Sequence, residues 1–88
     1  MPGQRRGEGT GLSYPCTWSY TVIGRSEADL ARAIDSVAQA RDHEVSQPRR
    51  SSDGNYCAVT LRLTVFDERD RRSIYEALRE RAETIIVL

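Results

Sequence analysis

The residue types that most often carry chemistry in proteins are scarce and widely spaced in this chain. His43 is the single histidine, and no serine or cysteine stands at a spacing that would make it the base of a nucleophile. Cys16 and Cys57 are isolated, whereas zinc requires four nitrogen or sulfur ligands, or three and a water. We therefore expect no metal, no cofactor and no catalytic centre, with His43 solvated in a loop and both cysteines buried as small apolar side chains.

The charged residues exclude several classes of function. All 13 basic residues are arginine, so a Walker-type phosphate loop and a Schiff-base enzyme, which both require lysine, are excluded. The 13 acidic residues bring the net charge to zero, which argues against nonspecific nucleic-acid binding. No apolar run approaches the ~20 residues of a membrane span, and the N-terminus lacks the apolar stretch of a signal peptide. We expect a cytoplasmic protein without membrane contact.

Hydrophobic periodicity predicts the elements that would position any site. Period two predicts half-buried strands, and apolar stripes at helical spacing predict two helices, capped by Ser26 and Asp67. Pro48 cannot donate to a ladder, so its strand is expected at a sheet edge, and Asp-Gly within residues 51–55 predicts a hairpin turn. The expected order is strand 16–22, helix 26–41, strand 43–50, strand 57–65, a second helix from residue 67, and strand 85–88.

This βαββαβ order predicts an α+β ferredoxin-like sandwich, with a four-stranded antiparallel sheet of order 4-1-3-2 and both helices on one face. Residues 1–12 are expected to form a disordered tail before a single domain over residues 13–88. The two cysteines begin antiparallel neighbouring strands, which places them at opposite ends as free thiols. The outward sheet face carries no aromatic side chain, which argues against RNA binding. The predicted core is Trp18, Tyr20, Val22, Leu30, Ile34, Val59, Leu61, Leu63, Ile74 and Leu78.

Three segments of the chain carry a family resemblance. The segments are Tyr14-Pro15 with WSYTVIG at 18–24, SSDGNY at 51–56 with Val59-Thr60, and Ile74-Tyr75 with Leu78 and the terminal Val87-Leu88. In this order they resemble the YbeD-like family of uncharacterised bacterial proteins, although Thr21 replaces the usual lysine. The resemblance implies a ferredoxin-like fold similar to the ACT-type regulatory domains of amino-acid enzymes, and it implies no known activity.

The predicted topology brings the first strand-to-helix turn and the hairpin to the same end of the sheet. Backbone N–H groups at a helix start, with arginines beside them, suit a carboxylate or a phosphate. Glu27 and Asp29 oppose an anion, and the alternative is a helix cap plus a hairpin that is held by its own polar side chains. The candidate ligand-binding residues are Gly24, Arg25, Ser26, Arg50, Ser52 and Asn55.

Two hypotheses about function follow from these patterns. The first is a noncatalytic regulatory domain that senses a small anionic metabolite in ACT-like fashion and acts on a partner enzyme. The alternative is a protein-interaction adaptor that acts through its sheet edge or its polar sheet face. A homodimer would form through the last strand, residues 85–88, or through the sheet face, because the edge near Pro48 is blunted against pairing.

Overall fold

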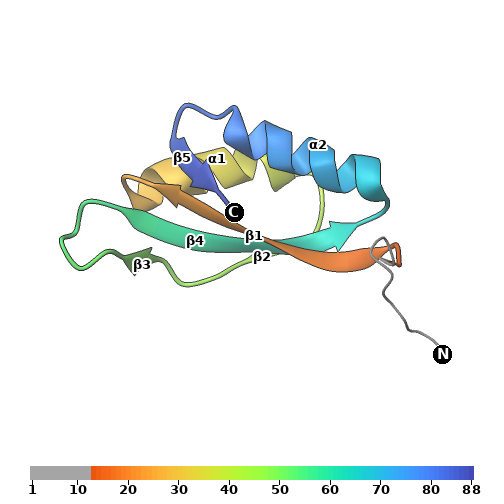
Figure 1. The fold of residues 1–88 in the computed structure, drawn as a ribbon, viewed down its shortest axis with the longest axis horizontal. Coiled ribbons are helices and arrows are strands. Elements are labelled where there is room, and N and C mark those ends of the chain that lie inside the picture. The colour runs from red at the N-terminus through yellow and green to blue at the C-terminus, as the bar shows by residue number, and fades with distance from the viewer. Residues whose placement is uncertain (1–12) are drawn as a thin grey trace.

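The computed structural model describes residues 13–88, and the expected tail over residues 1–12 lies outside the described residues. Both helices cover one face of an antiparallel sheet, and the other face carries no helix of the described chain (Figure 1). This is the predicted ferredoxin-like arrangement. In chain order the elements are β1 (Cys16–Gly24), α1 (Glu27–Ala38), β2 (His43–Val45), β3 (Arg49–Arg50), β4 (Cys57–Val65), α2 (Glu68–Arg79) and β5 (Thr84–Val87).

The sheet order is β2-β4-β1-β5, which confirms the predicted order of strands. β1 and β4 form its centre through a continuous antiparallel ladder that runs from Cys16 opposite Val65 to Gly24 opposite Cys57. The two cysteines therefore lie at opposite ends of this ladder, roughly 26 Å apart at the rise of an extended strand. Both are free thiols, since no disulfide can span that separation.

The predicted strand over residues 43–50 is wrong as a single element, and the sheet has five strands rather than four. β2 and β3 both pair with β4, and the segment between them, residues 46–48, contains one residue more than the opposing stretch of β4. Ser46 replaces a ladder partner there: its N–H donates to the carbonyl of Thr60 (3.0 Å), and its Oγ accepts from the Thr60 N–H (2.9 Å). Pro48 has no N–H to continue the pairing, so the strand bulges and divides.

The two helices begin where their caps predict. Ser26 and Asp67 each accept a hydrogen bond from the backbone N–H three residues later, at Asp29 and Asp70. α1 ends at Ala38, earlier than the predicted Arg41. Arg41 leaves the helix because its guanidinium forms a bidentate pair with Asp70 on α2, at 2.9 and 3.0 Å, and this contact ties the end of one helix to the start of the other.

One hydrophobic core lies between the sheet and the helices. The predicted core residues are all in this cluster, and nine of them are buried, whereas Trp18 is half-buried and packs at its margin. Trp18 and Leu61 lie on the same face of the sheet, as the predicted register requires. On the opposite face, Thr17, Ser19, Arg62 and Thr64 are exposed to solvent.

Candidate functional site

An unpaired stretch of backbone along β1 is the first component of the candidate site. β5 pairs with β1 only from Val22 to Gly24, and Leu88 extends the contact by one residue to Thr21. In Figure 1 the end of the chain, marked C, lies near the middle of β1, and the first half of β1 continues without a neighbour on that side. Among the described residues, the segment Cys16–Tyr20 thus has β4 on one side and no strand on the other.

The pairing pattern shows which backbone groups face this free edge. Thr21 and Leu88 exchange both of their backbone hydrogen bonds, at 3.1 and 2.8 Å, so the N–H and C=O of Thr21 point toward β5. Backbone groups alternate sides along an antiparallel strand, so those of Ser19 and Thr17 point the same way. The N–H groups of Trp18 and Tyr20 point toward β4 instead. The free edge therefore offers two residues, Thr17 and Ser19, with their donors and acceptors available.

A groove runs beside the free edge, between β1 and α2, with a volume of about 1070 Å³. It is open to solvent rather than enclosed, so it suits a ligand that stays partly exposed better than a small molecule that must be surrounded. Its walls combine aromatic, aliphatic and charged side chains. We call it the edge groove, and its lining residues are Trp18, Tyr20, Glu68, Arg69, Arg71, Arg72, Ser73, Tyr75, Glu76 and Leu88.

Hydrogen bonds and a cation–π contact fix the aromatic wall of the edge groove. The buried Tyr20 hydroxyl donates to the backbone carbonyl of Arg71 (2.6 Å), and burial raises the pKa of Tyr20 to about 12. The Nε of Arg71 donates to the Tyr14 hydroxyl (3.0 Å), and its guanidinium lies 4.9 Å from the ring centroid of Trp18. Arg71 thus joins three aromatic residues from the start of the chain to α2, so the wall is held in place before anything binds.

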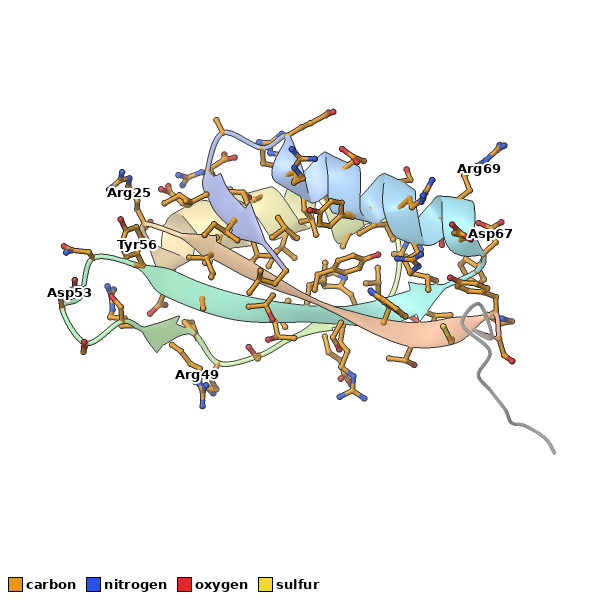
Figure 2. The ribbon with its side chains drawn as sticks, in the orientation of Figure 1. Arg25, Arg49, Asp53, Tyr56, Asp67 and Arg69 are labelled. Carbon is orange, nitrogen blue, oxygen red and sulfur yellow. The ribbon has the colours of Figure 1, made fainter. Side chains whose placement is uncertain are left out.

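Three arginines and two glutamates line the edge groove. Arg72 forms a surface pair with Glu68 at 3.5 Å, one turn along the same helix. Arg71 and Arg69 form no ion pair with a carboxylate of residues 13–88, and Arg69 extends into solvent from the first turn of α2 (Figure 2). The groove is therefore better suited to a partner with carboxylates than to one with added positive charge.

The predicted anion-binding residues do lie at one end of the molecule. Gly24 and Arg50 flank Cys57 of β4 on its two sides, so the first turn of the chain and the hairpin share an end of the sheet. Figure 2 shows Arg25 and Tyr56 at this end of the molecule, with Asp53 at the tip of the hairpin. Within the described chain, however, no hydrogen bond or ion pair joins residues 24–26 to residues 51–55.

The polar groups of the hairpin hold the hairpin itself. The Ser51 hydroxyl donates to Asp53 (2.6 Å) and accepts from the Tyr56 N–H (3.2 Å), while the Asn55 N–H donates to Asp53 (3.1 Å). Gly54 completes the turn at a φ of 76°, which favours glycine. The bonds from Ser51 and Asn55 lower the pKa of Asp53, so its carboxylate stays charged near any bound anion. Ser52 and Asn55 are exposed, as are Arg25 and Arg50.

The remaining polar residues have structural partners. The Nδ1 of His43 lies 2.9 Å from the carbonyl of Arg41, and the side chain is half-buried rather than freely solvated as predicted. The part of the chain that the structure describes brings together no group of three or more histidine, cysteine or carboxylate side chains that could hold a metal. Neither helix of residues 13–88 has the length and apolar character that a membrane crossing requires.

The edge groove was not predicted from the sequence, although two patterns could have indicated it. The apolar alternation from Cys16 is longer than the run from Ile85 to Leu88, so these two segments cannot pair along their full lengths. Arg69, Arg71 and Arg72 also cluster at the start of the second helix, close in sequence to the aromatic stripe of Tyr75. Neither pattern shows by itself that Trp18 lies under an arginine, because that contact joins residues far apart in the chain.

Fold and surface together define a small α+β domain of the ferredoxin-like, ACT-like class with an open sheet edge. A family model described as a protein of unknown function, DUF493, matches residues 10–88, and the chain belongs to this family. It is 32% identical over 69 residues to a UPF0250 protein of Yersinia pestis, covering 76% of this chain and 79% of that protein. A UPF0250 protein of Paraburkholderia phytofirmans is 30% identical over 71 residues, with 76% and 80% covered. These matches confirm the resemblance to the YbeD-like family.

Solved structures confirm the fold. The solution structure of protein HP0495 from Helicobacter pylori has a TM-score of 0.75 and 19% identity, covering all of this chain and 94% of that one. The crystal structure of the ACT domain from the GTP pyrophosphokinase of Chlorobium tepidum has a TM-score of 0.61 and 12% identity, with 84% and 96% covered. At these sequence identities, the structural similarity shows a shared fold and says nothing about function.

Proposed function

We propose that this chain is a noncatalytic regulatory module that acts by binding a partner protein through the free edge of β1 and the edge groove. The observation that supports it is the coincidence of two features: unpaired backbone at Thr17 and Ser19, and a pre-organised aromatic and arginine wall beside it. Exposed strand edges are templates for pairing with another chain. This favours the adaptor hypothesis over metabolite sensing as the main role.

The chemistry of the edge groove supports binding rather than catalysis. The Tyr20 hydroxyl already donates to the Arg71 carbonyl, and the Arg71 guanidinium is held by Tyr14 and the Trp18 ring. The pKa of Tyr20 is raised away from neutral pH, where an acid or base would need to operate. One structural neighbour is an ACT domain of a GTP pyrophosphokinase, a domain of this fold within an enzyme. By analogy, we propose that the partner of this chain is an enzyme whose activity it modulates.

Site-specific photocrosslinking in living cells tests this role. A photoreactive amino acid placed at Thr17, on the free edge, should give a crosslinked product with a single partner protein, in the same yield in repeated experiments. The same amino acid at Asp35, which is exposed on α1 and far from the edge groove, serves as the matched control and should capture none. Equal products from both positions, or none from either, would contradict a binding role for this edge.

A small anionic ligand at the hairpin end is the second candidate function. Its support is the placement of Arg50 and Gly24 on opposite sides of Cys57, which brings an arginine and the start of α1 to the same end of the helix-covered face. An exposed site of this kind would be weak, about micromolar to millimolar, and sensitive to salt. The helix start by itself contributes only about 0.3–1 kcal/mol.

Titration with acidic metabolites, followed through backbone amide shifts, tests the anion site. Binding should move residues 24–26 and 51–55, and Arg50→Ala should weaken it without unfolding the domain, because Arg50 is exposed. Arg62→Ala, an equal change of charge on the open sheet face, is the control and should leave affinity unchanged. If both variants weaken binding alike, the effect is general electrostatics rather than a site.

A further inference from the structure

We infer that the segment recognised by the edge groove is an extended strand that pairs antiparallel with Cys16–Tyr20, with alternating apolar side chains and flanking carboxylates. This inference rests on the proposed binding function and specifies the partner's conformation and chemistry. It makes the bound segment a continuation of the sheet in the direction of β5, beyond the position of Leu88.

Backbone geometry is the first argument for an extended strand. Thr17 and Ser19 each present an N–H and a C=O toward the free edge, at the spacing that an antiparallel neighbour requires. A docked helix satisfies its own backbone groups and would leave these four unpaired. The available length is five residues, from the residue next to Thr21, where Leu88 ends the β5 pairing, to the start of β1 at Cys16.

Side-chain alternation is the second argument, because it assigns each partner residue to a face. Partner residues opposite Thr17 and Ser19 would place their side chains on the open face, beside exposed hydroxyls. Partner residues opposite Trp18 and Tyr20 would place theirs on the helix side, in the edge groove. There they meet Trp18, Tyr75 and Leu88, so apolar side chains fit at these alternate positions.

Charge decides between a foreign segment and a second copy of this chain. The edge groove carries three arginines against two glutamates, and neither Arg69 nor Arg71 is paired with a carboxylate of the described residues. A second copy that paired β1 with β1 would bring two sets of these unpaired arginines together. A segment with carboxylates beside its apolar residues complements them, so we assign the site to an acidic extended segment of a different protein.

The probe for this inference is a blocked pentapeptide, Asp-Thr-Val-Thr-Asp, which matches the five free residues of the edge. With the valine opposite Trp18 and the aspartates opposite Cys16 and Tyr20, on the side of the edge groove, binding should slow hydrogen exchange of the Thr17 and Ser19 amides. The Trp18 and Tyr20 amides, already bonded to β4, should not change. Replacing both aspartates by lysine should weaken binding about tenfold or more at low salt.

Backbone N-methylation of the peptide is the decisive control, because it leaves the protein untouched. Methylating the threonine that lies opposite Ser19 removes a donor to the free edge and should weaken binding about ten- to hundredfold. Methylating the neighbouring valine, whose N–H points away from β1, should change affinity little. On the protein, Ser19→Pro should abolish binding, while Ser19→Ala, which keeps the N–H, should retain it.

The outcomes separate this inference from the proposed function. Equal effects of both methylations, with crosslinking from Thr17 intact, would overturn the strand geometry and leave the binding role in place. Absence of both crosslinking and peptide binding would contradict both. Protection of the Thr17 and Ser19 amides that rises with protein concentration, without peptide, would instead identify a second copy as the occupant and overturn the assignment to an acidic partner.

Discussion

Replacement of Gly24 by alanine should destabilise the domain, because no room exists for a Cβ at this position. Gly24 is the buried last residue of β1. An added Cβ would lie 2.7 Å from the carbonyl oxygen of Glu83 and 2.8 Å from Cδ2 of Leu30. The leucine side chain can rotate, but the carbonyl belongs to the backbone that leads into β5. The start of β5 must therefore move away from β1.

The magnitude follows from two opposing effects. Overpacking of this kind costs about 1–3 kcal/mol, while the smaller conformational freedom of alanine in the unfolded chain returns about 0.4–1 kcal/mol. We expect Gly24→Ala to lower the free energy of unfolding by about 1–2 kcal/mol. Urea denaturation measures this change in unfolding free energy, provided that its dependence on urea concentration stays the same in parent and variant. Changes in backbone amide chemical shifts should centre on Leu30 and Glu83.

Gly54→Ala is the matched comparison, because a Cβ there meets nothing within 4 Å and only the φ of 76° resists the change. The backbone amide chemical shifts that Gly54→Ala changes should be confined to the hairpin. If Gly24→Ala leaves stability within about 0.3 kcal/mol of the parent, the packing argument is refuted. If anion binding is lost at the same time, Gly24 would be a ligand contact rather than a close approach between strands.

Three further predictions concern ionisable groups. The pKa of Tyr20 is raised from 10.0 to about 12, so the unfolded chain releases this proton first as pH rises. Unfolding free energy should therefore fall between about pH 10 and 12, and Tyr20→Phe should flatten this dependence in alkaline denaturation curves. Hydrogen bonds from Arg41 lower the pKa of Asp70, so its contribution is present above the ordinary value of 3.8 and is lost as pH falls below it. Asp70→Asn should cost about 1–2 kcal/mol at pH 7 and little in acid, where urea curves of parent and variant should converge. A thiol reagent should modify half-buried Cys16 well before buried Cys57, and equal rates would contradict the burial of Cys57 in the core.

The central elements could be predicted from the sequence because local patterns determine them. Alternation from Cys16 onward and again from Cys57 fixed which faces are buried, and Ser26 and Asp67 marked the helix starts. In each case the residues that specify the element lie within it. Once the buried strand faces and the helix starts are known, pairing the strands antiparallel gives the observed sheet.

The features that escaped prediction depend on contacts between distant segments. α1 ends early because Arg41 reaches Asp70, 29 residues further along the chain. The edge strand divides because the Ser46 side chain, rather than the backbone alone, meets Thr60. The predicted anion residues share an end of the sheet, yet no hydrogen bond or ion pair among the described residues joins the two segments. Gly24 is buried, Ser26 caps α1, and the others, Arg25, Arg50, Ser52 and Asn55, are exposed. For the same reason the contact of Arg71 with Trp18 could not be inferred from either segment separately.

The divided strand on the far side of the sheet limits how many chains can add to this domain. The outward groups of β4 are already occupied there, by Ser46 at Thr60 and by the Arg41 guanidinium at the carbonyl of Thr64 (3.2 Å). Beyond them lie only two short strands that are separated by Pro48. Among the described residues, the sheet therefore has one edge at which another strand could pair, and one edge that is interrupted. Under the proposed binding role, the domain would accept a single strand, and the interrupted edge would disfavour further growth into fibres.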